Sequence, residues 1–121
     1  MAGFEVSVHG VWHAELHRDI PRVPNIGFLI DGQVFHPGDA LTVPPVPVGT
    51  LLVPIHGPWS RTADLIDWIR EVNPDRAIAV HDAALSDVGR AMIAGFLGEN
   101  SPVPTGVPYQ HLASAESIRL T

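Results

Sequence analysis

The second half of the sequence constrains the fold most. Short apolar runs alternate there with segments whose apolar side chains recur at helical spacing. Residues 50–55 and 77–80 are short, mostly apolar runs with β-branched side chains, the pattern of strands buried on both faces. Residues 60–72 and 86–97 repeat apolar side chains at helical spacing, and residues 107–112 could form a last strand. Strand, helix, strand, helix and strand in this order predict an α/β fold.

The ends of both helices carry local signals. Ser60 or Thr62 is expected to cap the first helix, and the Asn73-Pro74 pair is expected to end it. Ser86 is the expected N-cap of the second helix, and Gly98 its expected C-cap. The side chains of the second helix that are expected to face inward are Val88, Met92, Ile93, Phe96 and Leu97.

The first third of the sequence is rich in β signals. In residues 4–17 the even-numbered positions are mainly apolar and the odd-numbered positions mainly polar. This alternation predicts a strand with one apolar face, and Gly10 could interrupt the strand. His9, His13 and His17 fall on the other parity, so we expect the three imidazoles to share a face. The apolar parity includes Phe4, Val6, Val8 and Trp12.

A β-hairpin is predicted next, from residues 25–30 and 33–36 joined by the Asp31-Gly32 turn. Its second strand leads into Pro37-Gly38-Asp39, a stiff turn that holds one carboxylate at the strand end. The proline-rich residues 43–49 cannot form a regular ladder, so we expect a surface loop there.

Composition limits the classes of function. The 121 residues suffice for one domain with a single core, and no apolar run is long enough to cross a bilayer. The net charge of −6 and the seven scattered basic side chains, none of them Lys, argue against a nucleic-acid groove. We expect a cytoplasmic protein, because residues 1–5 show no export signal.

Histidine is the unusual component of the chain: its seven copies equal Lys and Arg together, and cysteine is absent. A bound metal would therefore be held by imidazole and carboxylate groups, which suits zinc first, or manganese or iron. Side chains of this kind follow predicted strands, where α/β proteins carry functional groups, at His13, His17, Asp39, His56 and His81. A single His or Asp at such a position is more often a solvated or turn residue, and that alternative stays open for each.

The sequence motifs of other kinds of catalytic site are not present in the chain. The sequence holds no Gly-x-Ser-x-Gly elbow and no Cys nucleophile. Gly57-Pro58 opens the first predicted helix, but without the glycine-rich run and the lysine of a phosphate loop. A metal site is therefore the favoured hypothesis.

Three segments, in order, resemble a known family. Phe35-His36-Pro37-Gly38-Asp39, residues 51–59 and Ala79-Val80-His81-Asp82 resemble the C-terminal half of metallo-β-lactamase-fold hydrolases, in the lactonase-like branch that also includes phosphodiesterases. Residues 10–17 are similar to that branch's third metal-ligand segment. The resemblance implies a single domain over residues 1–121, built as the second β-sheet and the helices of the family's αββα sandwich.

The resemblance also implies roles for individual residues. His13 would bind a first metal ion, Asp39 would bridge two ions and His81 would bind the second. In such a centre, metal-bound hydroxide hydrolyses an ester, a lactone or a phosphodiester. Supporting or structural roles stay open for His17, His36, His56 and Asp82, and Trp59 is a candidate pocket wall.

The chain departs from the family in one large respect. The His-x-His-x-Asp-His segment, which supplies most ligands of both ions, is not in this sequence. No catalytic residue is secure, and we expect a portion of a metal-dependent hydrolase that is inactive alone. The missing N-terminal half or a second copy would then cover the apolar face of the first strand. The alternative is an inactive half-domain that acts as a homodimeric binding or structural module.

Overall fold

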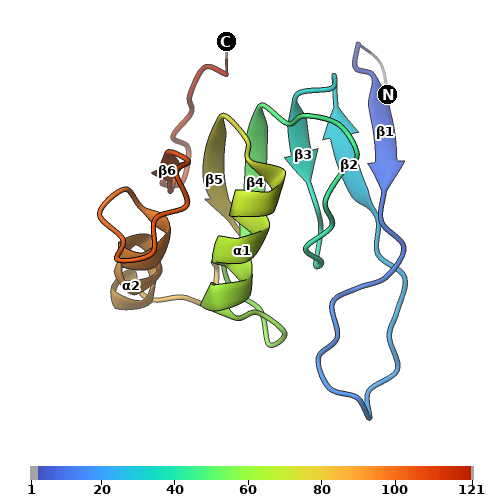
Figure 1. The fold of residues 1–121 in the computed structure, drawn as a ribbon, viewed down its shortest axis with the longest axis horizontal. Helices are drawn as coiled ribbons and strands as arrows, with labels where there is room; N and C mark the ends of the chain where they lie inside the picture. Colours follow the sequence, from blue (N-terminus) through green and yellow to red (C-terminus); the bar gives the residue numbers. More distant parts are fainter. Residues whose placement is uncertain (1–2, 121) are drawn as a thin grey trace.

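A computed structural model describes residues 3–120, and residues 1, 2 and 121 of the predicted domain lie outside the described part. The α/β class is confirmed, because six strands form one mixed sheet that is accompanied by two helices (Figure 1). The strands lie in the sheet in sequence order. They are β1 (Val6–His9), β2 (Gly27–Ile30), β3 (Val34–His36), β4 (Thr50–Pro54), β5 (Arg76–Val80) and β6 (Tyr109–Gln110).

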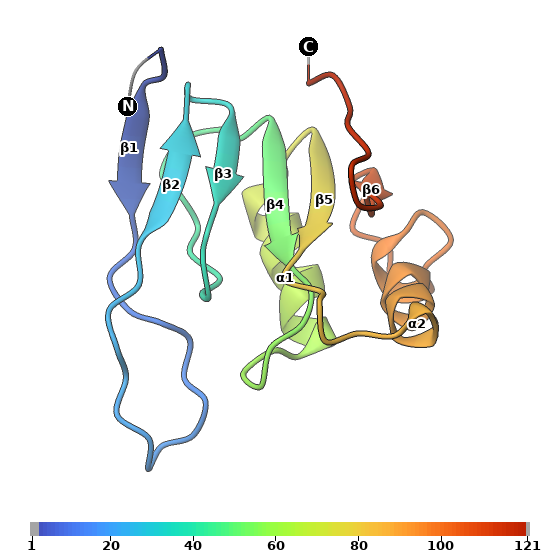
Figure 2. The same cartoon turned by 180° about the vertical axis from the view of Figure 1, so that it is seen from behind.

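The strand directions decide where the loops gather. β1, β2 and β3 pair antiparallel, whereas β3, β4, β5 and β6 pair parallel. β1, β3, β4 and β5 therefore run in one direction and end at the same edge of the sheet, the lower edge in Figures 1 and 2. The segments that carry His13, Asp39, His56 and His81 all leave the sheet at this edge.

Helix α1 (Thr62–Val72) covers one face of the central strands. Its side chains Leu65 and Ile69 are buried with Leu51 and Val53 of β4 in one apolar core. The burial of β4 agrees with its continuous apolar run.

The two ends of α1 differ in how well local signals predict them. The helix ends at Asn73, as the Asn73-Pro74 pair predicts, and Asn73 itself has the left-handed conformation (φ 50°). The prediction that Ser60 or Thr62 caps the other end is wrong, because Arg61 holds the N-cap position and its side chain makes no capping hydrogen bond.

Helix α2 (Asp87–Leu97) begins and ends where predicted. Ser86 Oγ accepts a hydrogen bond from Gly89 N (3.1 Å) and caps the first turn. Gly98 follows the last turn, and its N–H donates to Ala94 O. Among residues 3–120, neither α1 nor α2 combines the length and the apolar character that a membrane crossing requires.

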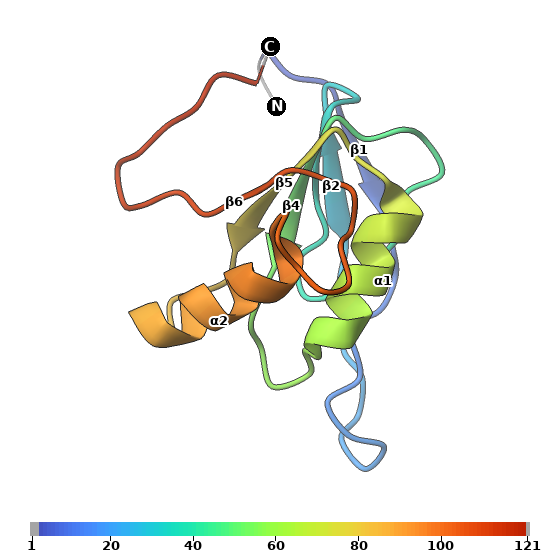
Figure 3. The same cartoon turned by 60° about the vertical axis from the view of Figure 1, so that its left-hand side comes forward.

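Five side chains of α2 were predicted to face inward, and this prediction is wrong for three of them. Leu97 is buried, and Ile93 packs against the core. Val88 is 72% exposed, and Met92 and Phe96 are also exposed. The reason is the position of the helix, which crosses the end of the sheet instead of lying flat against it, so that its last turn reaches the core (Figure 3).

The β2–β3 hairpin forms as predicted. Asp31 (φ 53°) and Gly32 (φ 64°) both have positive φ, as a type I′ turn requires. Residues 43–49, predicted to be a surface loop, lie outside every strand and helix.

The first strand is shorter than the alternation predicts. β1 ends at His9, and Gly10 (φ 90°) turns the chain out of the strand. Residues 10–26 form a long loop beyond the edge of the sheet (Figures 1 and 2). His13 and His17 lie on this loop, so the prediction that they share a strand face with His9 is wrong.

One face of the sheet, toward the viewer in Figure 2, is covered by neither α1 nor α2, the helices of residues 3–120. We call it the bare face. Val8, Phe28 and His36 pair across β1, β2 and β3 and therefore point to the same side, which is the bare face. Val8 is 58% exposed and Phe28 41% exposed. At the other end of the sheet the C-terminal segment is tied to β5, because Arg76 Nη1 donates to Arg119 O (3.2 Å).

Candidate functional site

Three of the predicted ligands meet at the lower edge of the sheet. His13 comes from the loop after β1, Asp39 from the turn after β3 and His81 from the loop after β5. Asp39 Oδ1 lies 2.9 Å from His81 Nε2, and Asp39 Oδ2 lies 3.6 Å from His13 Nε2. The common direction of these strands thus brings together side chains that are distant in the sequence.

Hydrogen bonds to neighbouring backbone fix the position of Asp39. Asn25 Oδ1 accepts from Asp39 N (3.1 Å), and Asn25 Nδ2 donates to Pro37 O (2.9 Å). Ala14 N donates to Asp39 O (2.8 Å). Gly38 has φ 71°, and a Cβ there would lie 2.5 Å from Asn25 Oδ1, so the turn requires glycine. The role of Asn25 depends on contacts with residues 12 and 14 positions away, so no local sequence pattern reveals it.

One oxygen of the Asp39 carboxylate lacks a hydrogen-bond donor among residues 3–120. Its Oδ1 is buried and accepts no hydrogen bond among the described residues. His81 Nε2 is close, at 2.9 Å, but does not align as a donor, so the contact is an ion-pair distance without hydrogen-bond geometry. A buried carboxylate oxygen without a donor is unfavourable by at least about 1–3 kcal/mol. This position therefore favours a cation.

The tautomer of His13 follows from its contacts. Its Nδ1 lies 2.6 Å from Ala14 O, and because a carbonyl oxygen only accepts, Nδ1 must carry the proton. In the neutral ring, Nε2 then presents a lone pair to Asp39 Oδ2, another acceptor. Two acceptors that face each other are a suitable pair of ligands for a cation. Histidine ligands of metals commonly donate their other ring N–H to a backbone carbonyl in this way.

The contacts of the three side chains are pairwise. Asp39 contacts one histidine with each oxygen. Across residues 3–120, no group of three or more His, Asp or Glu side chains is arranged to hold one metal ion. A single ion held by His13, Asp39 and His81 would therefore require the two imidazoles to reorient around the carboxylate.

His81 has a left-handed backbone conformation, with φ 60°. This conformation is unfavourable by about 1–2 kcal/mol for a residue other than glycine. Such strain persists where the surroundings fix the backbone, and it concentrates at functional sites.

The strain at His81 leads to a stability prediction. His81→Gly and His81→Ala both remove the imidazole, and we expect the Gly variant to be more stable by about 1 kcal/mol. The sign is the reverse of that in an ordinary strand or helix, where Ala is the more stable residue. Urea unfolding of both variants, followed by circular dichroism, measures the difference. An Ala variant that equals or exceeds the Gly variant would show that residue 81 is not held left-handed.

Two further predicted histidines make local contacts. His17 is exposed, and its Nδ1 accepts a hydrogen bond from Asp19 N (3.0 Å). His36 Nδ1 accepts from Gly38 N (3.0 Å) and so supports the turn that carries the carboxylate.

A cavity of about 380 Å³ opens beside His81. The loops after β4 and β5 line it with His56, Gly57, Pro58, His81, Ala83 and Ala84. The two histidines are its ionisable side chains, and the others are small or apolar. Trp59, the predicted pocket wall, does not line this cavity, but lies edge-on to His13 with ring centroids 6.4 Å apart.

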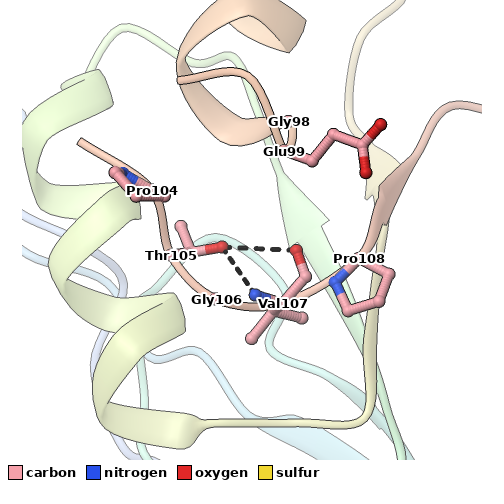
Figure 4. Close-up of a pocket in the computed structure, with 7 residues that line it drawn as sticks. All are labelled: Gly98, Glu99, Pro104, Thr105, Gly106, Val107 and Pro108. Carbon is pink, nitrogen blue, oxygen red and sulfur yellow. Dashed lines mark hydrogen bonds between the residues drawn. The ribbon is translucent and has the colours of Figure 1, made fainter. Parts of the chain in front are cut away.

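A second cavity, of about 280 Å³, lies in the loop between α2 and β6 (Figure 4). It is lined by Gly98, Glu99 and residues 104–108. Thr105 Oγ1 bonds to Val107 N (3.1 Å) and is thus engaged within the loop. Glu99 is the one ionisable side chain in this lining.

Asp82, next to His81, belongs to a cluster of charged groups. His111 Nε2 lies 2.5 Å and Arg90 Nη1 3.8 Å from Asp82 Oδ2. The hydrogen bond from His111 holds the pKa of Asp82 below its ordinary value of 3.8, although burial opposes this. Burial, with a smaller effect of the Asp82 charge, raises the pKa of Tyr109 to about 12. No sequence pattern indicates His111 and Arg90, because they join Asp82 only in the folded chain.

The lowered pKa of Asp82 predicts a pH-dependent contribution to stability. The folded carboxyl releases its proton more readily than the unfolded one, so its contribution is complete above pH 3.8 and is lost as pH falls through the folded pKa. We expect Asp82→Asn to lower the free energy of unfolding at neutral pH and to approach the wild type in acid. Urea unfolding across this pH range measures the difference, and a constant difference would contradict the prediction.

Comparison with known proteins places the chain beside one relative of greater length. No protein-family model matches the chain. It is 35% identical over 104 residues to Protein Rv0786c of Mycobacterium tuberculosis (strain ATCC 25618 / H37Rv), a match that covers 82% of this chain and 49% of that protein. The chain therefore spans about half the length of the curated relative that it matches. The name of that relative states no activity.

Proposed function

We propose that the chain is a portion of a metal-dependent hydrolase, with His13, Asp39 and His81 as metal ligands. The observation that supports this most is the surroundings of Asp39: Oδ1 accepts no hydrogen bond among the described residues, and Oδ2 lies 3.6 Å from His13 Nε2. One cation beside these atoms would satisfy both oxygens. Two imidazoles and a carboxylate form a donor set of catalytic zinc sites, and manganese or iron also accept these ligands.

The proposed reaction is hydrolysis of an ester, a lactone or a phosphodiester, as the resemblance to metallo-β-lactamase-fold hydrolases implies. A bound divalent ion would supply Lewis acidity and would lower the pKa of a coordinated water. The protein would supply the substrate position, because the 380 Å³ cavity adjoins His81. His56 in its wall could form one hydrogen bond to a substrate oxygen.

A complete two-metal centre would need ligands from outside this chain. The sequence holds no His-x-His-x-Asp-His segment, and the chain corresponds to about half of its longer relative. We propose that a second half supplies those ligands and packs on the bare face, where Val8 and Phe28 are exposed. The chain alone would then hold one ion through His13, Asp39 and His81 and would not catalyse.

Metal content of the isolated chain tests this proposal. The chain is equilibrated with Zn²⁺, separated from free ion and analysed for zinc. We expect bound zinc in the wild type, none in His13→Ala, and wild-type content in His9→Ala, whose histidine contacts Ser7 Oγ on β1. Zinc that binds equally to all three forms, or to none, would overturn the assignment.

The bare face supports a second candidate function, an inactive half-domain that pairs with a copy of itself as a binding or structural module. Val8 and Phe28 lie together on this face, and contiguous apolar surface of this kind marks association sites. Sedimentation equilibrium at micromolar concentration tests this candidate. A dimer that Val8→Asp dissociates would support the module, and a monomer in the wild type would exclude it.

A further inference from the structure

The backbone of His81 is fixed on both sides. Before it, Ile55 N donates to Val80 O (3.0 Å), which anchors the end of β5 to the end of β4. After it, Leu85 N donates to Asp82 O (2.9 Å) and closes the first turn of the loop. The strained φ of 60° at His81 therefore lies between two anchored peptides.

The side chain of Asp82 extends this anchoring to two other elements. His111, which directly follows β6, contacts Asp82 Oδ2 at 2.5 Å. Arg90 of α2 lies 3.8 Å from the same oxygen and donates to Leu85 O (2.8 Å). The contact of Asp82 with His111 is shorter than its contact with Arg90, and it joins residues 29 positions apart in the sequence.

We propose that His111 is a positioning residue that, through Asp82, holds His81 in the left-handed conformation in which its ring reaches Asp39. The effect of this positioning on metal binding rests on the proposed function, in which His81 is a ligand. Its effect on the conformation of the metal-free chain does not rest on the proposed function. The contact of Asp82 with His111 adds a side-chain anchor to the two backbone hydrogen bonds that flank His81.

Two substitutions of His111 separate positioning from general packing. His111→Phe keeps a ring of similar volume and removes the donor to Asp82, whereas His111→Gln keeps an N–H donor near the place of Nε2. His9→Ala, at the last residue of β1, is the control for loss of a histidine whose hydrogen-bond partner is Ser7. Should His111→Phe fail to fold, the smaller His111→Ala takes its place in the comparison.

The first measurement is made without metal. NMR of the wild type should show a left-handed His81 backbone, through its HN–Hα coupling and chemical shifts, and nuclear Overhauser effects between the His81 ring and the Asp39 β protons. We expect both signals to be lost in His111→Phe and kept in His111→Gln and His9→Ala. Signals that persist in a folded His111→Phe would overturn the positioning role.

The second measurement is the affinity for Zn²⁺ alone, by competition with a chromophoric chelator. Loss of a residue that orients a metal ligand typically weakens binding by about 10–100-fold, so we expect about tenfold for His111→Phe and near wild-type affinity for His111→Gln. If the wild type binds no Zn²⁺ while the NMR signals still depend on His111, the metal proposal fails and the positioning role stands. If Zn²⁺ binds equally to wild type and His111→Phe, the positioning role fails and the metal proposal stands.

Discussion

Asp39→Ala should weaken binding of Zn²⁺ by at least about 100-fold, equivalent to ~2.7 kcal/mol. Asp39 is the residue that contacts both His13 and His81, one with each carboxylate oxygen. Its removal would therefore take away the one anionic ligand and separate the two imidazoles. Isothermal titration of the metal-free chain with Zn²⁺ measures this loss.

The same substitution should have a small effect without metal. Oδ1 is buried without a donor, so its removal relieves a desolvated charge instead of breaking a hydrogen bond. We expect Asp39→Ala in a chelator to unfold at a urea concentration equal to or above that of the wild type. Asp64→Ala, which removes an exposed carboxylate from α1, is the matched control and should leave Zn²⁺ affinity unchanged. Unchanged affinity in Asp39→Ala would contradict the ligand assignment.

Phe35→Ala should lower the free energy of unfolding by about 3–5 kcal/mol. The Phe35 side chain is fully buried in the core below α1, and the substitution would leave a cavity there. A domain of this size has about 5–15 kcal/mol of stability in all, so a large fraction of it would be lost. Urea unfolding, followed by tryptophan fluorescence, measures the change.

Phe28→Ala is the matched control for Phe35→Ala. Phe28 lies on the neighbouring strand β2 but points to the bare face, where it is 41% exposed. In the isolated chain we expect Phe28→Ala to lower the free energy of unfolding by less than half as much as Phe35→Ala does. Equal losses, with an unfolding midpoint that depends on protein concentration, would show instead that a second copy covers the bare face.

Local sequence signals predicted those parts of the fold that local contacts determine. The Asp31-Gly32 turn and the Ser86 cap depend on residues within a few positions, and both form as predicted. The convergence of His13, Asp39 and His81 was also foreseen, because residues at the carboxyl ends of strands gather at one edge.

The errors arise where tertiary position decides. Gly10 ends β1 although the alternation continues for several residues beyond it. The helical spacing in α2 is present, but the helix crosses the end of the sheet and leaves Val88 in solvent. The contact between His111 and Asp82 joins two segments 29 positions apart, and no local pattern could reveal it.

The order of the strands has a consequence for the way the chain folds. Every strand pairs with the strand that precedes or follows it in the sequence, so the sheet can grow one neighbouring strand at a time. The site has a further requirement, since Asp39 contacts one residue that precedes β2 and one that follows β5. Its assembly should therefore be a late event, which follows the formation of the β3–β4–α1–β5 unit.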